Sequence, residues 1–120
     1  MTAEGYKRKL TAILSADVKG YSRLMGDDEE ATIRTLTAYR EVLADLIQKH
    51  QGLVVDSPGD NVLAQFKSVV DAVRCAVEIQ EELKARNAEV PENRKMEFLP
   101  SLSLAKVLTS RWMRHAHEVP

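Results

Sequence analysis

The sequence predicts an α+β fold in which two helices cover one face of a small sheet. Three observations support this prediction: short runs of strand-forming residues, two long amphipathic stretches between them, and a turn sequence at residues 57–60. These segments follow one another as strand, helix, strand, strand, helix, strand. Helices on one face of a mixed or antiparallel sheet form an α+β sandwich, and 120 residues are enough for one such domain.

The first strand is expected over residues 8–18. Apolar or small residues occupy both of its faces, which is typical of a central strand that is covered on each side. An acidic residue, Asp17, ends the strand, and a turn that contains Gly20 follows it.

The first helix is expected from about Glu29 to His50. Acidic residues suit a helix N-terminus, and Asp27 and Glu30 have the spacing of a capping box. Gly52 stands where the end of this helix is expected. One stripe of the helix should face the core, because apolar residues recur along it three or four positions apart: Leu36, Tyr39, Leu43 and Leu46.

A hairpin is expected between the strand-forming runs 53–55 and 62–66. Pro58 and Gly59 stand at the second and third positions of the turn that separates these runs. A type II turn favours proline at the second position and needs a positive φ angle at the third, which glycine adopts readily. The composition of this turn therefore predicts that the two runs pair as neighbouring strands.

The second helix is expected from about Ser68 to Arg86. Ser68 and Asp71 have the spacing of an N-cap residue and its N3 partner. The only cysteine, Cys75, is expected to be a small buried residue without a reactive role. A polar loop follows at residues 87–95, and another strand begins at 96–98. The apolar face of the helix is expected to include Val70, Val73, Ala76, Val77 and Leu83.

Two carboxylates stand out by their positions in these elements. Asp17 ends the first strand and Asp60 lies at the tip of the hairpin, so both reach one sheet edge if the hairpin packs beside that strand. Carboxylate oxygens suit Mg²⁺ or Mn²⁺, and two such ions can activate an attacking oxygen and stabilise a leaving phosphate. From the spacing alone, an ordinary structural role in a turn remains the alternative.

Composition and charge exclude several other classes of protein. The formal net charge is −1, which argues against a general nucleic-acid-binding protein. No apolar run approaches the roughly 20 residues that a membrane-spanning helix needs. With a single cysteine and no secretion signal, the chain is expected in the reducing cytoplasm.

Two motifs in this sequence resemble the metal motifs of class III adenylate and guanylate cyclases. LSADVKGYS, residues 14–22, is similar to the first motif of that family, and SPGDN, residues 57–61, with Val62, Ala64 and Phe66, is similar to the second. The intervening helix and the helix that begins near residue 71 match in length and character. The resemblance covers about residues 8–98, which form the cyclase-like part, between an N-terminal tail (1–7) and a divergent segment (99–120).

The resemblance implies a partial ferredoxin-like sandwich that works as a head-to-tail homodimer with active sites at its interface. It implies that Asp17 and Asp60, with the backbone carbonyl of Val18, hold two Mg²⁺ or Mn²⁺ ions. The loop of Val18, Lys19, Gly20, Tyr21 and Ser22 would cradle the nucleotide phosphates. The implied reaction converts ATP or GTP to a 3′,5′-cyclic nucleotide and pyrophosphate. The net charge and the short apolar runs separately predict that neither nucleic acid nor a membrane is a partner.

The sequence departs from the family pattern at the base-recognition position. Adenylate cyclases place a lysine four residues before the second metal-binding aspartate, and this chain has Asp56 there. An ionised carboxylate only accepts hydrogen bonds, so it cannot donate to a purine ring nitrogen. Guanylate cyclases carry an acidic residue at this position, which leaves both ATP and GTP open as substrates.

The second departure begins after Phe98, where the later catalytic motifs of the family are not found. The change predicts a truncated or frame-shifted copy with little activity of its own, or else a non-catalytic dimerisation and interaction module. Leu104 to His115 is expected to form an improvised helix over the exposed sheet. The basic and histidine side chains near the end are expected to lie on the surface without a catalytic or metal-binding role: Arg111, Arg114, His115 and His117.

Overall fold

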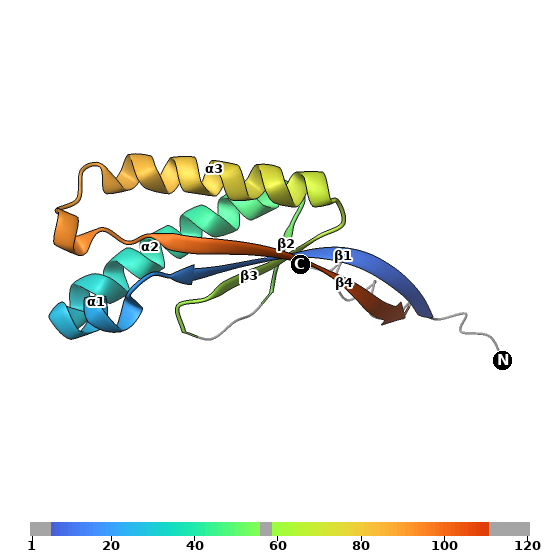
Figure 1. The fold of residues 1–120 in the computed structure, drawn as a ribbon, viewed down its shortest axis with the longest axis horizontal. Helices are drawn as coiled ribbons and strands as arrows, with labels where there is room; N and C mark the ends of the chain where they lie inside the picture. Colours follow the sequence, from blue (N-terminus) through green and yellow to red (C-terminus); the bar gives the residue numbers. More distant parts are fainter. Residues whose placement is uncertain (1–5, 56–58, 111–120) are drawn as a thin grey trace.

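The computed structural model describes residues 6–55 and 59–110. The elements are β1 (Tyr6–Val18), α1 (Tyr21–Asp27), α2 (Glu29–Lys49), β2 (Leu53–Val55), β3 (Val62–Phe66), α3 (Val69–Asn87), the short 3₁₀ helix η1 (Glu92–Arg94) and β4 (Phe98–Ser110). The predicted α+β class and the predicted element order are confirmed, with α1 as an added helix. Figure 1 shows α2 and α3 on the same side of the sheet.

The four strands form one antiparallel sheet in the order β2-β3-β1-β4. β1 is a central strand: Ala12 to Ala16 pair with β3 on one side, and the whole of β1 pairs with β4 on the other. The hairpin of β2 and β3 forms over the runs that the sequence predicts, and Gly59 has the positive φ angle expected of it, 69°. Pro58 lies outside the described residues.

The two faces of β1 differ in a way that the sequence does not reveal. Ala12, Leu14, Ala16 and Val18 are buried beneath the helices, whereas Asp17, on the opposite face, is exposed. Successive side chains of a strand point to opposite faces of its sheet. The expectation that β1 is covered on both sides is therefore wrong at the end of the strand, although Thr11, on the same face as Asp17, is only 9% exposed.

α2 begins one residue later than the capping-box spacing suggests. The side chain of Asp28, not Asp27, caps this helix, and its Oδ1 accepts a hydrogen bond of 3.0 Å from the backbone N–H of Ala31. The buried stripe is close to the predicted one, but Ile47 takes the place of Leu46, which is only partly buried. The buried residues of α2 are Thr32, Leu36, Tyr39, Leu43 and Ile47.

α3 turns a different face to the sheet from the one that the sequence suggests. Its N-cap is as predicted, since Ser68 Oγ accepts a hydrogen bond of 3.2 Å from the N–H of Asp71. Val70, Val73 and Val77, however, are 56%, 43% and 53% exposed, so the expectation that they face the core is wrong. Leu83 is buried and Ala76 is partly buried, as expected, and the other apolar side chains that α3 buries are Ala72, Cys75 and Ile79.

Residues 99–110 continue β4 without a break. The expected helix from Leu104 is therefore wrong as far as Ser110, and the rest of that expectation lies outside the described residues, as do Arg111, Arg114, His115 and His117. β1 would otherwise present unpaired backbone groups along its second edge, and β4 satisfies them over the full length of the strand. Pairing with a distant strand has overridden local helix preference here.

A buried polar cluster joins the two long helices to the segment before β4. Tyr39 on α2 donates from its hydroxyl to Asn87 Oδ1 on α3, at 2.8 Å. Asn87 Nδ2 donates to the carbonyl of Met96 (2.9 Å), and the N–H of Met96 donates back to Asn87 Oδ1 (3.2 Å). Burial also raises the pKa of the Tyr39 phenol. Because buried polar groups without partners are costly, this cluster fixes where the segment from η1 to β4 lies.

No helix in residues 6–55 and 59–110 is long and apolar enough to cross a membrane.

Candidate active site

Asp17 lies near the end of β1, on the face opposite to that of its buried neighbours Ala16 and Val18. Ser15 is on the same face one step earlier, because alternate residues of a strand share a face. Leu99 of β4 is the cross-strand partner of Asp17 and is 53% exposed. The carboxylate of Asp17 is therefore accessible to solvent at the end of the sheet nearest α1.

Asp60 is brought to the same place by the hairpin that joins β2 to β3. It is half-buried and comes two residues before Val62, whose cross-strand partner is Ala16 of β1. The preceding residue, Gly59, accepts a hydrogen bond through its carbonyl from the guanidinium of Arg40 on α2. The register of β3 with β1 and this contact with α2 together determine where Asp60 lies.

Two reciprocal hydrogen bonds connect the surroundings of the two carboxylates. The N–H of Val18, next to Asp17 in the chain, donates to Asp60 Oδ2 at 3.3 Å. In return, Asn61 Nδ2, next to Asp60 in the chain, donates to Asp17 Oδ1 at 2.6 Å and to Ser15 Oγ at 2.9 Å. Each carboxylate thus has one oxygen held by a neighbour of the other. The structure brings together the two residues that the sequence places at one edge.

The turn between β1 and α1 stands directly beside this pair. Gly20 is the N-cap residue of α1 and has a left-handed conformation, φ 65° and ψ 34°. The N–H of Lys19 donates to the carbonyl of Glu97 at 2.8 Å, so the turn is also attached to the segment before β4. A cleft of about 270 Å³ opens beside Lys19 and Gly20, and charged side chains of both signs line the rest of it: Arg23, Glu92, Lys95 and Glu97.

Among curated proteins, the chain is similar to two long ones. It is 42% identical over 109 residues to "Putative adenylate cyclase 3" of Rhizobium meliloti (strain 1021). The aligned region covers 90% of this chain and 19% of that protein. It is also 29% identical over 104 residues to "Serine/threonine-protein kinase pkn2" of Myxococcus xanthus. Here the aligned region covers 86% of this chain and 12% of that protein. No protein-family model matches the chain.

Among solved structures, the chain is similar to the adenylate/guanylate cyclase/hydrolase from Silicibacter pomeroyi. The TM-score is 0.77 and the identity 33%, over 86% of this chain and 60% of that chain. Over the matched residues, this chain is a cyclase-like domain, similar to adenylate and guanylate cyclases. It spans about a fifth of the curated cyclase relative and 60% of the solved chain, so it corresponds to a part of them.

Two residues of this site have no role that the sequence alone predicts. The amide of Asn61, which lies within the second motif, donates to Asp17 Oδ1 and to Ser15 Oγ. An amide directly after a turn carboxylate is a signal that could have suggested this. Asp56, the residue at the expected base-recognition position, lies outside the described residues.

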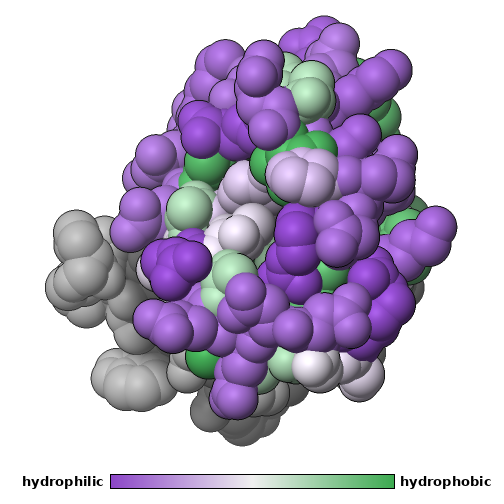
Figure 2. Space-filling view, turned by 90° about the vertical axis from the view of Figure 1, so that its left-hand side faces the viewer, coloured by the Kyte–Doolittle hydropathy of each residue, from purple (hydrophilic) through white to green (hydrophobic). Residues whose placement is uncertain are grey.

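In the part of the chain that the structure describes, neither a larger cluster of metal ligands nor the cavity near α3 lies at the paired carboxylates. Within residues 6–55 and 59–110, no group of three or more histidine, cysteine, aspartate or glutamate side chains could hold a metal ion. A cavity of about 560 Å³ lies elsewhere, between the C-terminal half of α3 and the start of β4, where Leu83 and Phe98 line it. Figure 2, which views the molecule from its α1 end, shows a mainly hydrophilic surface with scattered hydrophobic residues.

Proposed function

We propose that this chain supplies the metal- and phosphate-binding part of a nucleotide cyclase active site. The substrate class is ATP or GTP, and the products are a 3′,5′-cyclic nucleotide and pyrophosphate. In this reaction the ribose 3′-oxygen attacks the α-phosphorus, the bond to the β-phosphate breaks, and the hydroxyl loses its proton. The observation that carries the proposal is the reciprocal pair of hydrogen bonds between Val18 and Asp60 and between Asn61 and Asp17.

The donor atoms at this place fit two Mg²⁺ or Mn²⁺ ions. Asp17 and Asp60 each have one carboxylate oxygen engaged by the neighbour of the other, which leaves the second oxygen of each for a ligand. With the carbonyl of Val18, all the proposed ligands are hard oxygen atoms, as these ions prefer. Such ions, when bound, supply positive charge that offsets the charge on the α-phosphate and on the departing pyrophosphate.

Backbone N–H groups of the turn after Asp17 are proposed to bind phosphate oxygens. The N–H groups of Val18 and Lys19 are already bonded, to Asp60 and to the carbonyl of Glu97. No other described residue accepts a hydrogen bond from the N–H groups of Gly20, Tyr21 and Ser22. Of the five residues from Val18 to Ser22, these last three are therefore the best placed to donate to a phosphate.

The proposal includes a homodimer and a low activity for the chain alone. The match covers 60% of the solved cyclase chain, so residues needed for full turnover are expected to come from outside the matched part. ATP and GTP are cytoplasmic metabolites, which makes the cytoplasm the proposed location. Asp56 is proposed to occupy the base-recognition position.

Binding of an unreactive nucleotide tests this proposal without requiring turnover. The probe is ATP, and separately GTP, with a methylene group between the α- and β-phosphorus atoms, titrated calorimetrically in the presence of Mn²⁺. We expect binding that requires Mn²⁺ and is lost in Asp17→Asn but kept in Asp45→Asn, a matched change at an exposed carboxylate of α2. Binding that is equal with and without Mn²⁺ would sink the proposal, as would unchanged binding by Asp17→Asn.

A second candidate function is a non-catalytic dimerisation and interaction module. The observation that favours it is the exposure of three leucines on the edge strand β4: Leu99 (53%), Leu102 (44%) and Leu104 (57%). Apolar patches and free strand edges promote association. If this reading is right, sedimentation equilibrium shows a dimer that Leu102→Ser weakens, while the nucleotide analogue does not bind. A monomer at every concentration would count against it.

A further inference from the structure

α1 has little intrinsic stability, although it carries the proposed phosphate-binding turn at its N-terminus. It has seven residues, its N-cap Gly20 provides no side-chain hydrogen bond, and Leu24 is its only buried residue. Its first turn has no acidic residue and its last turn no basic residue. Because isolated helices of this length are unstable in water, contacts with the rest of the fold must hold α1 in place.

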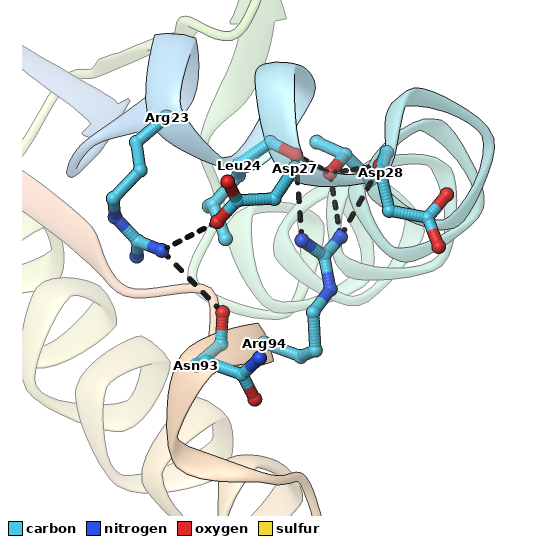
Figure 3. Close-up of polar contacts among 7 residues, drawn as sticks. Arg23, Leu24, Asp27, Asp28, Asn93 and Arg94 are labelled. Atoms are coloured by element: carbon cyan, nitrogen blue, oxygen red, sulfur yellow. Dashed lines mark hydrogen bonds and ion pairs between the residues drawn. The ribbon is translucent and has the colours of Figure 1, made fainter.

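Arg94 of η1 supplies such contacts at the C-terminal end of α1 (Figure 3). Its Nη1 donates to the carbonyl of Leu24 at 3.3 Å, and its Nη2 donates to the carbonyl of Asp28 at 3.4 Å. Nη2 also donates to the hydroxyl of Thr32 at 2.6 Å, and that side chain is fully buried in α2. One guanidinium therefore bridges the junction of α1 and α2 from a segment more than 60 residues away in the chain.

The charge of Arg94 suits this place as well as its shape does. The carbonyl of Leu24 already accepts from the N–H of Asp28, and the carbonyl of Asp28 accepts from the N–H of Thr32, so Arg94 adds a charged donor to each. A guanidinium keeps its charge at all accessible pH values and presents several N–H donors in a fixed fork. Arg94 is half-buried, which strengthens these charged hydrogen bonds relative to exposed ones.

The segment that carries Arg94 is itself firmly placed, and it also contacts the other end of α1. Asn87 of α3 bonds to both backbone groups of Met96. The carbonyl of Glu97 accepts from the N–H of Lys19, one residue before the N-cap. Residues 94–97 thus hold α1 at both of its ends, against a buried polar anchor in α3.

We propose that Arg94 is a positioning residue for the nucleotide site. By fixing α1, it fixes the backbone of Gly20, Tyr21 and Ser22 relative to Asp17. This inference rests on the proposed function for the identity of the ligand, but the mechanical part rests on the contacts of Arg94 alone. Nothing in the spacing of the sequence signals this role, because the residues that Arg94 contacts are 62 to 70 positions away.

Three variants test the inference in the full chain. Arg94→Met removes the fork and keeps the length of the side chain, and Arg94→Lys keeps the charge but not the fork. Arg86→Met makes the same replacement at an exposed arginine of α3 that pairs with Glu82 at 3.0 Å. Comparing Lys with Met at position 94 separates loss of charge from loss of geometry.

Amide hydrogen exchange measures the positioning directly, and it does not depend on any ligand. The reporters are the N–H groups of Leu24 and Asp28, which bond within and at the end of α1, and the control is the N–H of Ala72 in α3. We expect Arg94→Met to speed exchange at Leu24 and Asp28 about tenfold or more, with little change at Ala72. Unchanged exchange at both reporters overturns the inference, and so does equal acceleration at Ala72.

Calorimetry then separates the inference from the proposed function. In Arg94→Met, affinity for the methylene nucleotide analogue with Mn²⁺ should fall about tenfold, and affinity for Mn²⁺ alone should stay within about twofold. Arg94→Lys should recover part of the loss, and Arg86→Met should resemble the unmodified chain. If the unmodified chain binds no nucleotide, the proposed function fails. The amide exchange result still shows in that case whether Arg94 holds α1 in place. Equal losses for Mn²⁺ and nucleotide contradict the inference.

Discussion

Gly52 offers the sharpest prediction about how this fold packs. It follows α2, and its N–H donates to the carbonyl of Ile47 at 2.8 Å, which closes the end of the helix. A Cβ atom added at Gly52 would lie 2.5 Å from Cε2 of Phe66 and 2.7 Å from Cγ2 of Ile47. Both of these side chains are 1% exposed, so neither has room to move toward solvent. Gly52→Ala therefore forces the junction of α2, β2 and β3 apart.

Two opposing contributions set the expected change in the free energy of unfolding for Gly52→Ala. Overpacking of a well-packed core costs about 1–3 kcal/mol. Replacing glycine by alanine lowers the conformational entropy of the unfolded chain, which is worth about 0.4–1 kcal/mol in the opposite direction. We expect Gly52→Ala to lower the free energy of unfolding by about 1–2 kcal/mol, since the steric term exceeds the entropic one.

Urea denaturation followed by circular dichroism measures this change, and Gly26→Ala is the matched control. Gly26 lies within α1, and a Cβ atom there would meet nothing within 4 Å. Because alanine favours a helix more than glycine does, Gly26→Ala should raise the free energy of unfolding by about 0.5–1 kcal/mol. Equal stabilisation of both variants would refute the close packing of Gly52 against Phe66.

Two further predictions concern side chains of α3. Hydrogen bonds from Lys49 and then from His50 lower the pKa of the Glu78 carboxyl from its ordinary 4.5. Because the folded pKa is the lower one, the stabilisation by Glu78 is present above pH 4.5 and is lost as the pH falls through the folded value. The difference in urea midpoint between the unmodified chain and Glu78→Gln should shrink on acidification, and a pH-independent difference would contradict this. Burial raises the pKa of the Cys75 thiol to about 11. A thiol reagent at neutral pH should therefore modify Cys75 only after urea unfolds the chain, and rapid modification of the folded chain would argue against its burial.

Local signals in the sequence predicted the elements whose cause is local. The hairpin of β2 and β3 follows from turn residues that include Gly59, and the start of α3 follows from a hydroxyl cap at Ser68. Such features depend on a few neighbouring residues, so no knowledge of the packing is required to find them. The motifs around Asp17 and Asp60 were found for the same reason.

Features that depend on distant parts of the chain could not be predicted in this way. α3 has two apolar stripes of the same period, one with Val73 and the other with Ile79, and only the approach of the sheet selects the second. β4 extends past Leu104 because β1 offers it an unpaired edge. Arg94 has no local signal at all, since its partners Leu24 and Asp28 come together with it only in the folded chain.

Titration with Mn²⁺, followed by the electron paramagnetic resonance of the free ion, tests the paired carboxylates most directly. It needs neither nucleotide nor turnover, and the variants are Asp60→Asn and the exposed control Asp45→Asn. We expect the unmodified chain and Asp45→Asn to bind Mn²⁺ alike, and Asp60→Asn to bind at least about tenfold more weakly, because it loses a charged oxygen ligand. The same affinity in Asp60→Asn and the unmodified chain, or no binding by either, would contradict a metal site at Asp17 and Asp60.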